Sequence, residues 1–206
     1  KTLERGPIVD LAHGEQIEAV FPVYSWAEQD KLRAQLMRGY ELQRDEKYDE
    51  AIAEFTALLA ARPDDLTALL GRAQSYELSG REVESIADYE ALVAANPDDF
   101  GAKERLGRIL ASSPDANARN GRRAVELLTD VVAEWRRNPP NEYAISIALS
   151  ELAAAHAEAG DFEAAIAAQQ EAIETSKSEE ALDHLREVLQ RFEAKQPYHR
   201  QPPAAP

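Results

Sequence analysis

A spacing of about 34 residues recurs along this chain, and a fixed period of this length limits the fold more than any local pattern does. A small residue and a large one that follows it recur three times at this spacing: Gly39 and Leu42, Ala73 and Tyr76, Gly107 and Leu110. Further pairs separated by the same interval keep their size class: Ala51 and Ser85, Phe55 and Tyr89, Leu58 and Leu92, Pro63 and Pro97. A repeat of this length is one supersecondary unit that buries its apolar face against neighbouring units. The period therefore predicts a solenoid.

Within each repeat the apolar spacing is helical. Residues at i, i+3, i+4 and i+7 are apolar between residues 51 and 59, and nothing after residue 26 alternates like a strand. Asp65 and Asp99 stand where helix caps are needed, and Gly80 and Gly160 stand where a tight turn requires a positive φ. We expect helices over the following ranges: 26–44, 48–61, 65–79, 82–95, 99–112, 120–137, 141–159, 162–176 and 179–195.

These positions resemble the tetratricopeptide repeat (TPR) family, whose unit is a 34-residue pair of antiparallel helices. The resemblance covers residues 31–177. The small positions of the first helices are Gly39, Ala73, Gly107 and Ala153. The large position of the second helices holds Phe55, Tyr89, Leu128 and Gln169, of which the glutamine departs from the pattern. The resemblance implies an all-α, right-handed superhelical solenoid of about four antiparallel hairpins with a C-terminal capping helix.

The solenoid is expected over residues 25–195. Its repeats are predicted at 32–65, 66–99, 100–138 and 139–178, with the capping helix at 179–195. About five extra residues lengthen the turn of the third repeat, because the interval from Leu110 to Ala124 exceeds the matching interval from Leu42 to Ala51 by that number. This insert, with the Pro-Tyr tail at residues 197–198, resembles a bacterial branch of the family.

The two ends do not fit the repeat. Residues 1–24 are predicted to be an N-terminal arm or linker, with a weak hairpin as the alternative, because two isolated strands are marginal in water. Residues 196–206 are predicted to be a Pro-rich disordered tail. The first residue is Lys1 rather than methionine. We expect that a signal peptide or another domain precedes it, which leaves the compartment open between extracytoplasmic and cytoplasmic; the oligomeric state is open too.

The composition excludes several classes of function. The chain is acidic, with 38 acidic and 23 basic residues and a net charge of −15, which disfavours nucleic acid as a partner. It has no cysteine, so thiolate nucleophiles and cysteine metal sites are excluded. No apolar run approaches the roughly 18 residues of a membrane span, so no direct insertion into a membrane is expected.

No catalytic or metal-binding arrangement stands out. The four histidines are His13, His156, His184 and His199. They fall on separate segments, and no two of them have the i, i+4 spacing of a metal-binding pair on one helix. The acidic pairs fall at helix starts, where carboxylates interact favourably with the helix dipole. We therefore expect no enzymatic activity, no cofactor and no metal. For His156, packing in the position that Tyr76 occupies in the second repeat is favoured over ligation.

Residues 99–138 are locally basic, with eight basic and six acidic side chains. One interpretation is a patch for an anion or an acidic peptide near Arg105 and Arg108. The other, which we favour, is a set of solvated helix flanks, because cations are stabilising near the C-terminus of a helix. A weaker idea is a small-ligand site between the insert and the N-terminal arm, involving Arg119, Arg122 and Arg123.

The remaining hypothesis is surface recognition. The first helix of each repeat lines the concave side of such a solenoid, and the family positions predict these partner-binding residues: Arg33, Leu36, Tyr40, Gln43, Leu70, Gln74, Glu77, Arg105 and Arg108. The first function hypothesis is a non-enzymatic scaffold that binds a peptide or partner helix in this groove, as an accessory subunit or domain of a larger bacterial assembly. The alternative is a regulatory or targeting TPR domain cut from a larger enzyme.

Overall fold

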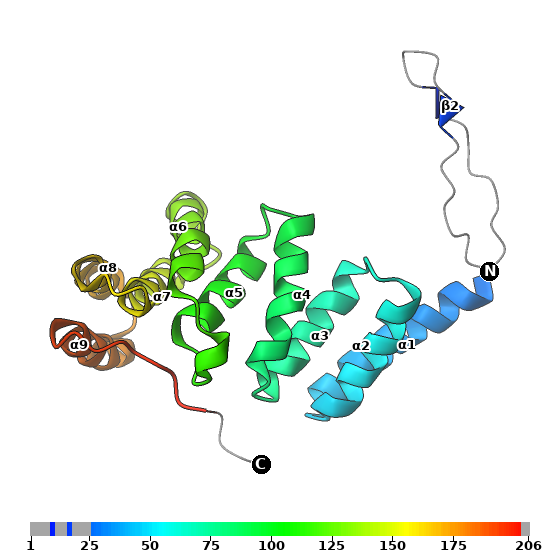
Figure 1. Ribbon diagram of the computed structural model, residues 1–206, viewed down its shortest axis with the longest axis horizontal. Coiled ribbons are helices and arrows are strands. Elements are labelled where there is room, and N and C mark those ends of the chain that lie inside the picture. Colours follow the sequence, from blue (N-terminus) through cyan, green and yellow to red (C-terminus); the bar gives the residue numbers. More distant parts are fainter. Residues whose placement is uncertain (1–8, 11–15, 18–25, 203–206) are drawn as a thin grey trace.

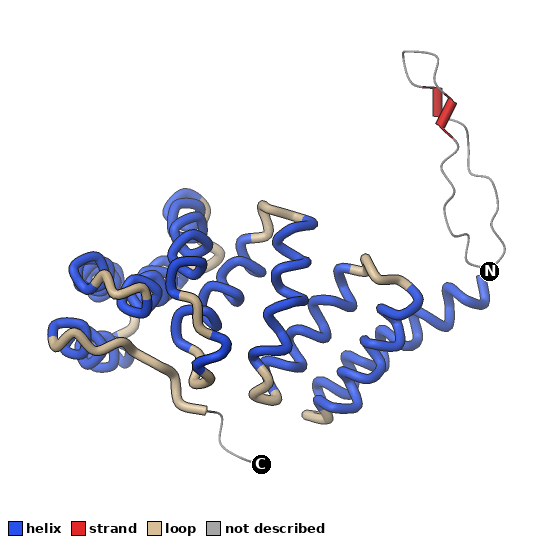
Figure 2. The backbone as a smooth tube through the Cα atoms, viewed as in Figure 1, coloured by secondary structure: helices blue, strands red, loops and turns tan. Residues whose placement is uncertain are grey.

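The computed structural model describes residues 9–10, 16–17 and 26–202, and the long described range forms a row of helices packed in sequence order (Figure 1). The helices are α1 Trp26–Arg44, α2 Tyr48–Ala61, α3 Leu66–Leu78, α4 Glu82–Ala95, α5 Phe100–Ser112, α6 Gly121–Arg137, α7 Ala144–Glu158, α8 Phe162–Thr175 and α9 Glu179–Glu193. A short 3-10 helix, η1, spans Ala116–Ala118. The chain is a helical solenoid, as its period predicts, and short loops join its helices (Figure 2).

The predicted helix bounds agree with the structure to within about three residues. The side chains of Asp65 and Asp99 accept hydrogen bonds from Ala68 N at 3.1 Å and Ala102 N at 2.9 Å, which confirms both caps. Gly80 and Gly160 have φ of 76° and 88°, as their turns require. The helix α7 begins three residues later than predicted. Its preceding turn is held by Asn141, whose Oδ1 accepts a hydrogen bond from Tyr143 N at 2.9 Å.

Only parts of the two ends fall within the described residues. The strands β1 (Val9–Asp10) and β2 (Gln16–Ile17) pair antiparallel, with Val9 opposite Ile17. The other residues of 1–24 lie outside the described ranges, so the arm or linker stays a prediction. The expectation of a disordered tail is wrong for residues 198–200. Arg200 N donates to Ser112 O at 2.8 Å, and Arg200 Nη2 donates to Glu82 Oε1 at 2.8 Å.

The contact between the first and second repeats explains why a small residue stands at Gly39, the first small position of the 34-residue pattern. The ring of Phe55, which is fully buried in α2, lies between Gly39 of α1 and Gly71 of α3. A Cβ atom on Gly39 would lie 2.6 Å from Phe55 Cε1, and one on Gly71 would lie 2.5 Å from Phe55 Cζ. Both distances are far below van der Waals contact. The two helices therefore approach this ring only because they carry glycine there.

The departure at Gln169 also has a structural reason. Gln169 is fully buried, and its Nε2 donates to Leu185 O of α9 at 2.9 Å. The neighbour of the fourth repeat is thus the terminal helix, which offers a backbone carbonyl group to the glutamine at the large position. On its inner face α9 buries Leu185, Val188 and Phe192, as expected of a capping helix.

The insert of the third repeat packs against the fourth repeat. Asn120 caps α6 by accepting from Arg123 N at 3.2 Å, and Arg119 Nε donates to Glu158 Oε1 at the end of α7 at 3.1 Å. At the first residue of α6, a Cβ on Gly121 would lie 2.4 Å from Ala159 N. Backbone therefore meets backbone at this point, and the longer turn joins two repeats rather than extending freely into solvent.

We predict that Gly71→Ala lowers the free energy of unfolding by about 1–3 kcal/mol, because the new methyl group overlaps the Phe55 ring. This loss is expected although alanine is the better helix former. Urea unfolding followed by circular dichroism measures it. In a Phe55→Leu background the overlap is relieved, so the same substitution has a smaller effect. An equal loss in both backgrounds would show that the ring is not the cause.

We predict that Gly121→Ala destabilises the chain by about 1–3 kcal/mol, since its new methyl group meets backbone atoms that cannot rotate away. The matched control is Gly101→Ala in the first turn of α5. Its Cβ would meet only Asp99 Oδ1 at 3.4 Å, and its effect is expected within about 0.5 kcal/mol. Thermal unfolding of both variants measures the difference. Equal midpoints would contradict the close packing of α6 on the α7–α8 turn.

Candidate binding groove

A hollow of about 350 Å³ is lined by α1, α3 and α5, which are the first helices of three successive repeats. Its lining residues are Tyr40, Gln43, Arg44, Gln74, Leu78 and Arg105. Four of these belong to the nine predicted partner-binding residues. The structure thus brings together side chains from three successive repeats. A hollow of this volume is at the lower end of the range for ligand sites in proteins.

Tyr40 and Gln43 form a fixed wall of the hollow. The Tyr40 hydroxyl donates to Thr67 O at 3.0 Å, and its ring meets Phe55 edge to face at a centroid distance of 5.2 Å. Burial and the nearby carboxylate of Asp65 raise the pKa of Tyr40 above its ordinary value. Gln43 Nε2 donates to Ser75 Oγ at 3.3 Å. Because these partners belong to α2 and α3, the wall is held by the packing of the first two repeats.

Gln74 and Leu78 present groups that other described residues do not use. Gln74 is half-buried and forms no side-chain hydrogen bond with another described residue, so its amide can both donate and accept. Leu78 is a large apolar residue that stays 52% exposed. It lies one helical turn beyond Gln74 on the same face of α3. The hollow therefore combines an available amide with an exposed apolar contact.

The remaining predicted residues lie elsewhere. Arg33 is exposed near the start of α1, and Leu36 and Leu70 pack against the core, so they serve packing. Arg44 and Leu78 line the hollow although they are not among the predicted residues. Leu78 could have been found from its i+4 spacing to Gln74, since residues at that spacing share a helix face.

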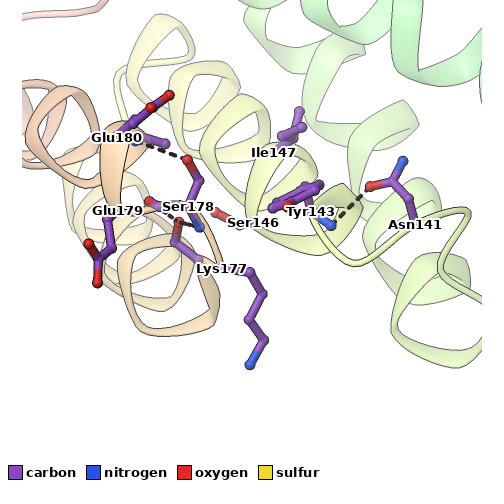
Figure 3. A pocket seen from close by; sticks show the side chains of 10 residues that line it. Asn141, Tyr143, Ser146, Ile147, Lys177, Ser178, Glu179 and Glu180 are labelled. Carbon is purple, nitrogen blue, oxygen red and sulfur yellow. Dashed lines mark hydrogen bonds between the residues drawn. The ribbon is translucent and has the colours of Figure 1, made fainter.

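A second hollow, of about 750 Å³, lies between α7 and the turn that joins α8 to α9 (Figure 3). Tyr143 and Ile147 contribute exposed apolar surface, at 44% and 50% exposure. On the opposite side Ser178 caps α9 by accepting from Ala181 N at 3.2 Å. The sequence analysis did not predict this hollow, because its two sides come from opposite ends of the fourth repeat and share no motif.

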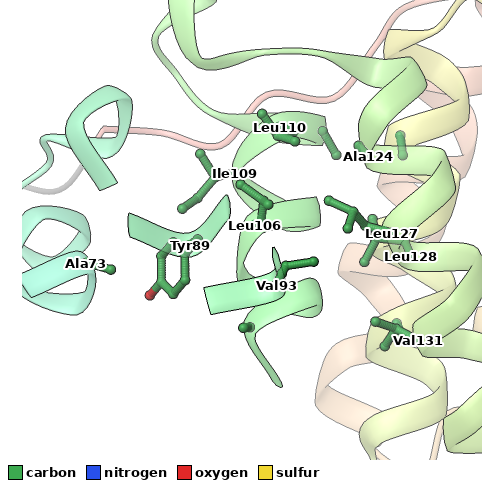
Figure 4. Packing of buried hydrophobic residues seen from close by; sticks show 14 of the residues in the cluster. Ala73, Tyr89, Val93, Leu106, Ile109, Leu110, Ala124, Leu127, Leu128 and Val131 are labelled. Carbon is green, nitrogen blue, oxygen red and sulfur yellow. The ribbon is translucent and has the colours of Figure 1, made fainter. Parts of the chain in front are cut away.

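A charged cluster lies beside the first hollow and is centred on Glu77. Glu77 Oε2 accepts hydrogen bonds from the Tyr89 hydroxyl at 2.9 Å and from Arg105 Nη1 at 3.3 Å. Glu77 Oε1 accepts a hydrogen bond from Arg108 Nη2. Burial alone would raise the pKa of Glu77, but Arg108, Tyr89 and Arg105 together hold it below its ordinary value. Burial and Glu77 raise the pKa of Tyr89, whose ring lies in the core with Leu106 and Ile109 (Figure 4).

The cluster continues through Arg108 into the fourth repeat. Arg108 Nε lies 3.5 Å from Glu104 Oε1 and 3.7 Å from Glu151 Oε1. Burial, aided by Glu104, raises the pKa of Glu151 well above its ordinary value, whereas Arg108 opposes this shift. The two arginines of the cluster are therefore matched by nearby carboxylates, and the cluster is no surplus of positive charge.

The same matching holds across residues 99–138. Seven of the eight basic side chains there lie within ion-pair distance of a carboxylate; the pairs are Lys103–Asp130, Arg105–Glu77, Arg108–Glu77, Arg119–Glu158, Arg123–Glu90, Arg136–Glu171 and Arg137–Glu134. Arg122 is exposed without a partner among the described residues. The interpretation as an open anion patch is therefore wrong, because carboxylates both inside and outside this range neutralise it.

Two kinds of feature are absent from the described residues: a grouping of side chains for a metal ion and a membrane-spanning helix. These residues contain no grouping of three or more histidine, aspartate or glutamate side chains placed to hold a metal ion. His156 is half-buried, and burial lowers its pKa although Asp161 lies 4.0 Å away. None of the described helices combines the length and apolar character needed to cross a membrane.

Two solved structures show the same fold. The MamA RS-1 ArsTM double mutant is similar to this chain with a TM-score of 0.63 and 17% sequence identity, over 81% of this chain and 92% of that one. A crystal structure of the MamA protein gives a TM-score of 0.58 and 16% identity over the same shares. No curated protein sequence matches the chain.

The sequence pattern of one family matches more than half of the chain. The tetratricopeptide repeat family matches residues 36–100 and 115–180, and the unmatched residues between them are most of α5 and the start of the insert. Repeats of this family typically mediate interactions between proteins and are generally not enzymes. The matched segments, the 34-residue period and the stacked helical hairpins together show that this chain belongs to the tetratricopeptide repeat family.

Proposed function

We propose that this chain is a non-enzymatic scaffold that binds a peptide or helical segment of a partner protein in the hollow between α1, α3 and α5. The observation that carries the proposal is that Tyr40, Gln43, Gln74 and Arg105, predicted from the repeat positions, line one hollow together. Partner binding is also the usual role of the family. We extend the proposal to an accessory role in a larger bacterial assembly.

The chemistry of the hollow favours a polypeptide over a small ion. Gln74 can pair with a backbone N–H and a backbone C=O at once, which is what an extended segment offers. Leu78 and the Tyr40 ring provide apolar contact for a neighbouring side chain. The positive charge of Arg105 is already matched by Glu77 at 3.3 Å, so a strongly acidic segment gains little. The partner segment we expect is mixed in character, with an apolar anchor and near-neutral charge.

Peptides selected from a random library by panning on the folded chain test this proposal. We predict that Gln74→Ala and Leu78→Ala each weaken the selected peptides by about 1–2 kcal/mol, or roughly 5- to 30-fold in Kd. Fluorescence anisotropy with labelled peptide measures the change. The substitutions lie on the helix surface, so we expect them to leave the fold intact.

Two controls match these changes outside the hollow. Gln170→Ala removes an exposed amide from α8, and Val83→Ala trims an exposed apolar side chain of α4. Neither is expected to change the affinity. Equal losses in the control and hollow variants would contradict the proposed site. A loss confined to Ile147→Ala would instead place the peptides in the second hollow.

A further inference from the structure

The segment that follows α9 runs back along the solenoid (Figure 1), and its residues 198–200 each contact the helices. The Tyr198 ring meets His184 of α9 edge to face at 5.6 Å. His199 Nε2 lies 2.7 Å from Glu158 Oε2 at the end of α7. Arg200 reaches the end of α5 and the start of α4. Three successive tail residues thus contact three successive parts of the solenoid, as an extended peptide ligand would.

Arg200 occupies a site built from two buried polar residues. Its backbone N donates to Ser112 O at 2.8 Å, its Nε donates to Ser112 Oγ at 3.1 Å, and its Nη2 donates to Glu82 Oε1 at 2.8 Å. Ser112 is 4% exposed and Glu82 is 7% exposed. A carboxylate buried to this degree needs a cation partner, because burial without one is strongly unfavourable.

The site has more acceptor capacity than Arg200 uses. Glu82 Oε2 and Glu151 Oε2 are buried and have no hydrogen-bond partner among the described residues. Glu158 accepts from Arg119 at 3.1 Å and still contacts His199. The charge of Arg200 acts on Glu151, where it partly offsets the rise in pKa that burial causes. This edge therefore selects a cationic segment, and a guanidinium group with several donors suits it better than an ammonium group.

The tail is only partly buried on the solenoid. Residues 193–196 before the three contacts and residues 201–202 after them are exposed, and none of residues 197–200 is fully buried. Leaving the site empty would strand Glu82 without its cation, whereas replacing one arginine with another would preserve every bond. Exchange of the tail for a similar segment is therefore favoured over simple release.

We propose that Glu82, Ser112 and Glu158 form a second peptide-binding site, for an extended segment that carries an arginine, and that residues 198–200 are its resident ligand. A partner segment with an arginine displaces the tail and takes over its contacts. This site lies at the ends of α4, α5 and α7, and it is distinct from the hollow between α1, α3 and α5. The two proposals can therefore fail separately.

A labelled peptide that copies residues 196–201 tests the site on the full chain. In an Arg200→Ala chain the resident ligand is disabled, so we expect the peptide to bind at least tenfold more tightly than it binds the unaltered chain, measured by fluorescence anisotropy. A peptide with alanine at the arginine position is expected to lose at least tenfold in affinity for the Arg200→Ala chain. Adding Glu82→Gln to that chain should cause a similar loss. Adding Glu84→Gln, an exposed carboxylate on the same helix, should cause none.

A second measurement avoids dependence on the folding of these variants. A protease site inserted between residues 195 and 196 allows the tail to be cut after the full chain has folded. The proposal predicts that excess peptide then displaces the cut tail, as seen by native mass spectrometry. It is overturned if the alanine peptide displaces the tail equally well, or if the cut tail remains bound at saturating peptide. Equal binding to the unaltered and Arg200→Ala chains, or to the Glu82→Gln and Glu84→Gln variants, also overturns it.

Discussion

The position of the Phe55 ring between Gly39 and Gly71 is the contact on which the first half of the solenoid depends. One side chain of α2 joins its own repeat to the next, since α1 and α3 both approach the ring at distances that only glycine permits. In a repeat protein each unit contacts only its neighbours, so the geometry of one such contact sets how the following unit is placed. Gly39 and Phe55, two residues of this contact, occupy the small and large positions of the 34-residue pattern.

The groove depends on the same ring. Tyr40 packs against Phe55 and reaches across to Thr67 O, so one wall of the hollow is fixed by the core contact. At the next interface Tyr89 takes the place of Phe55, and Arg105 stands at the position that Gly71 holds one repeat earlier. An aromatic–glycine contact is thereby replaced by a hydroxyl, a carboxylate and a guanidinium, joined through Glu77. The polar cluster beside the hollow therefore lies at the second interface, in the place that the apolar contact occupies at the first interface.

Local patterns were sufficient to predict the helices and their caps, whereas the repeat positions came from the 34-residue spacing. The helices and caps are local features. These features depend on residues within a few positions of one another, so helical periodicity and turn chemistry specify them. The charge of residues 99–138 was harder to interpret, because a count over a window omits partners outside it. Glu77, Glu90, Glu158 and Glu171 all lie beyond that window and neutralise it. The contact of the tail could not be predicted for a similar reason. Arg200 and Glu82 are 118 residues apart, and no spacing rule connects them.

The residue at the large position, and what it packs against, differs among the four repeats. The large position holds Phe55 against glycine, Tyr89 against a charged cluster, Leu128 against Gly107, and Gln169 against a carbonyl group of α9. At the position of Phe55, Gln169 Nε2 would lack this acceptor, because the neighbours there are Gly39 and Gly71. Phe55 in the last position would leave Leu185 O without the Gln169 donor. Each polar side chain at the large position therefore has a partner of its own: the Tyr89 hydroxyl donates to Glu77, and the Gln169 amide donates to Leu185 O of the capping helix.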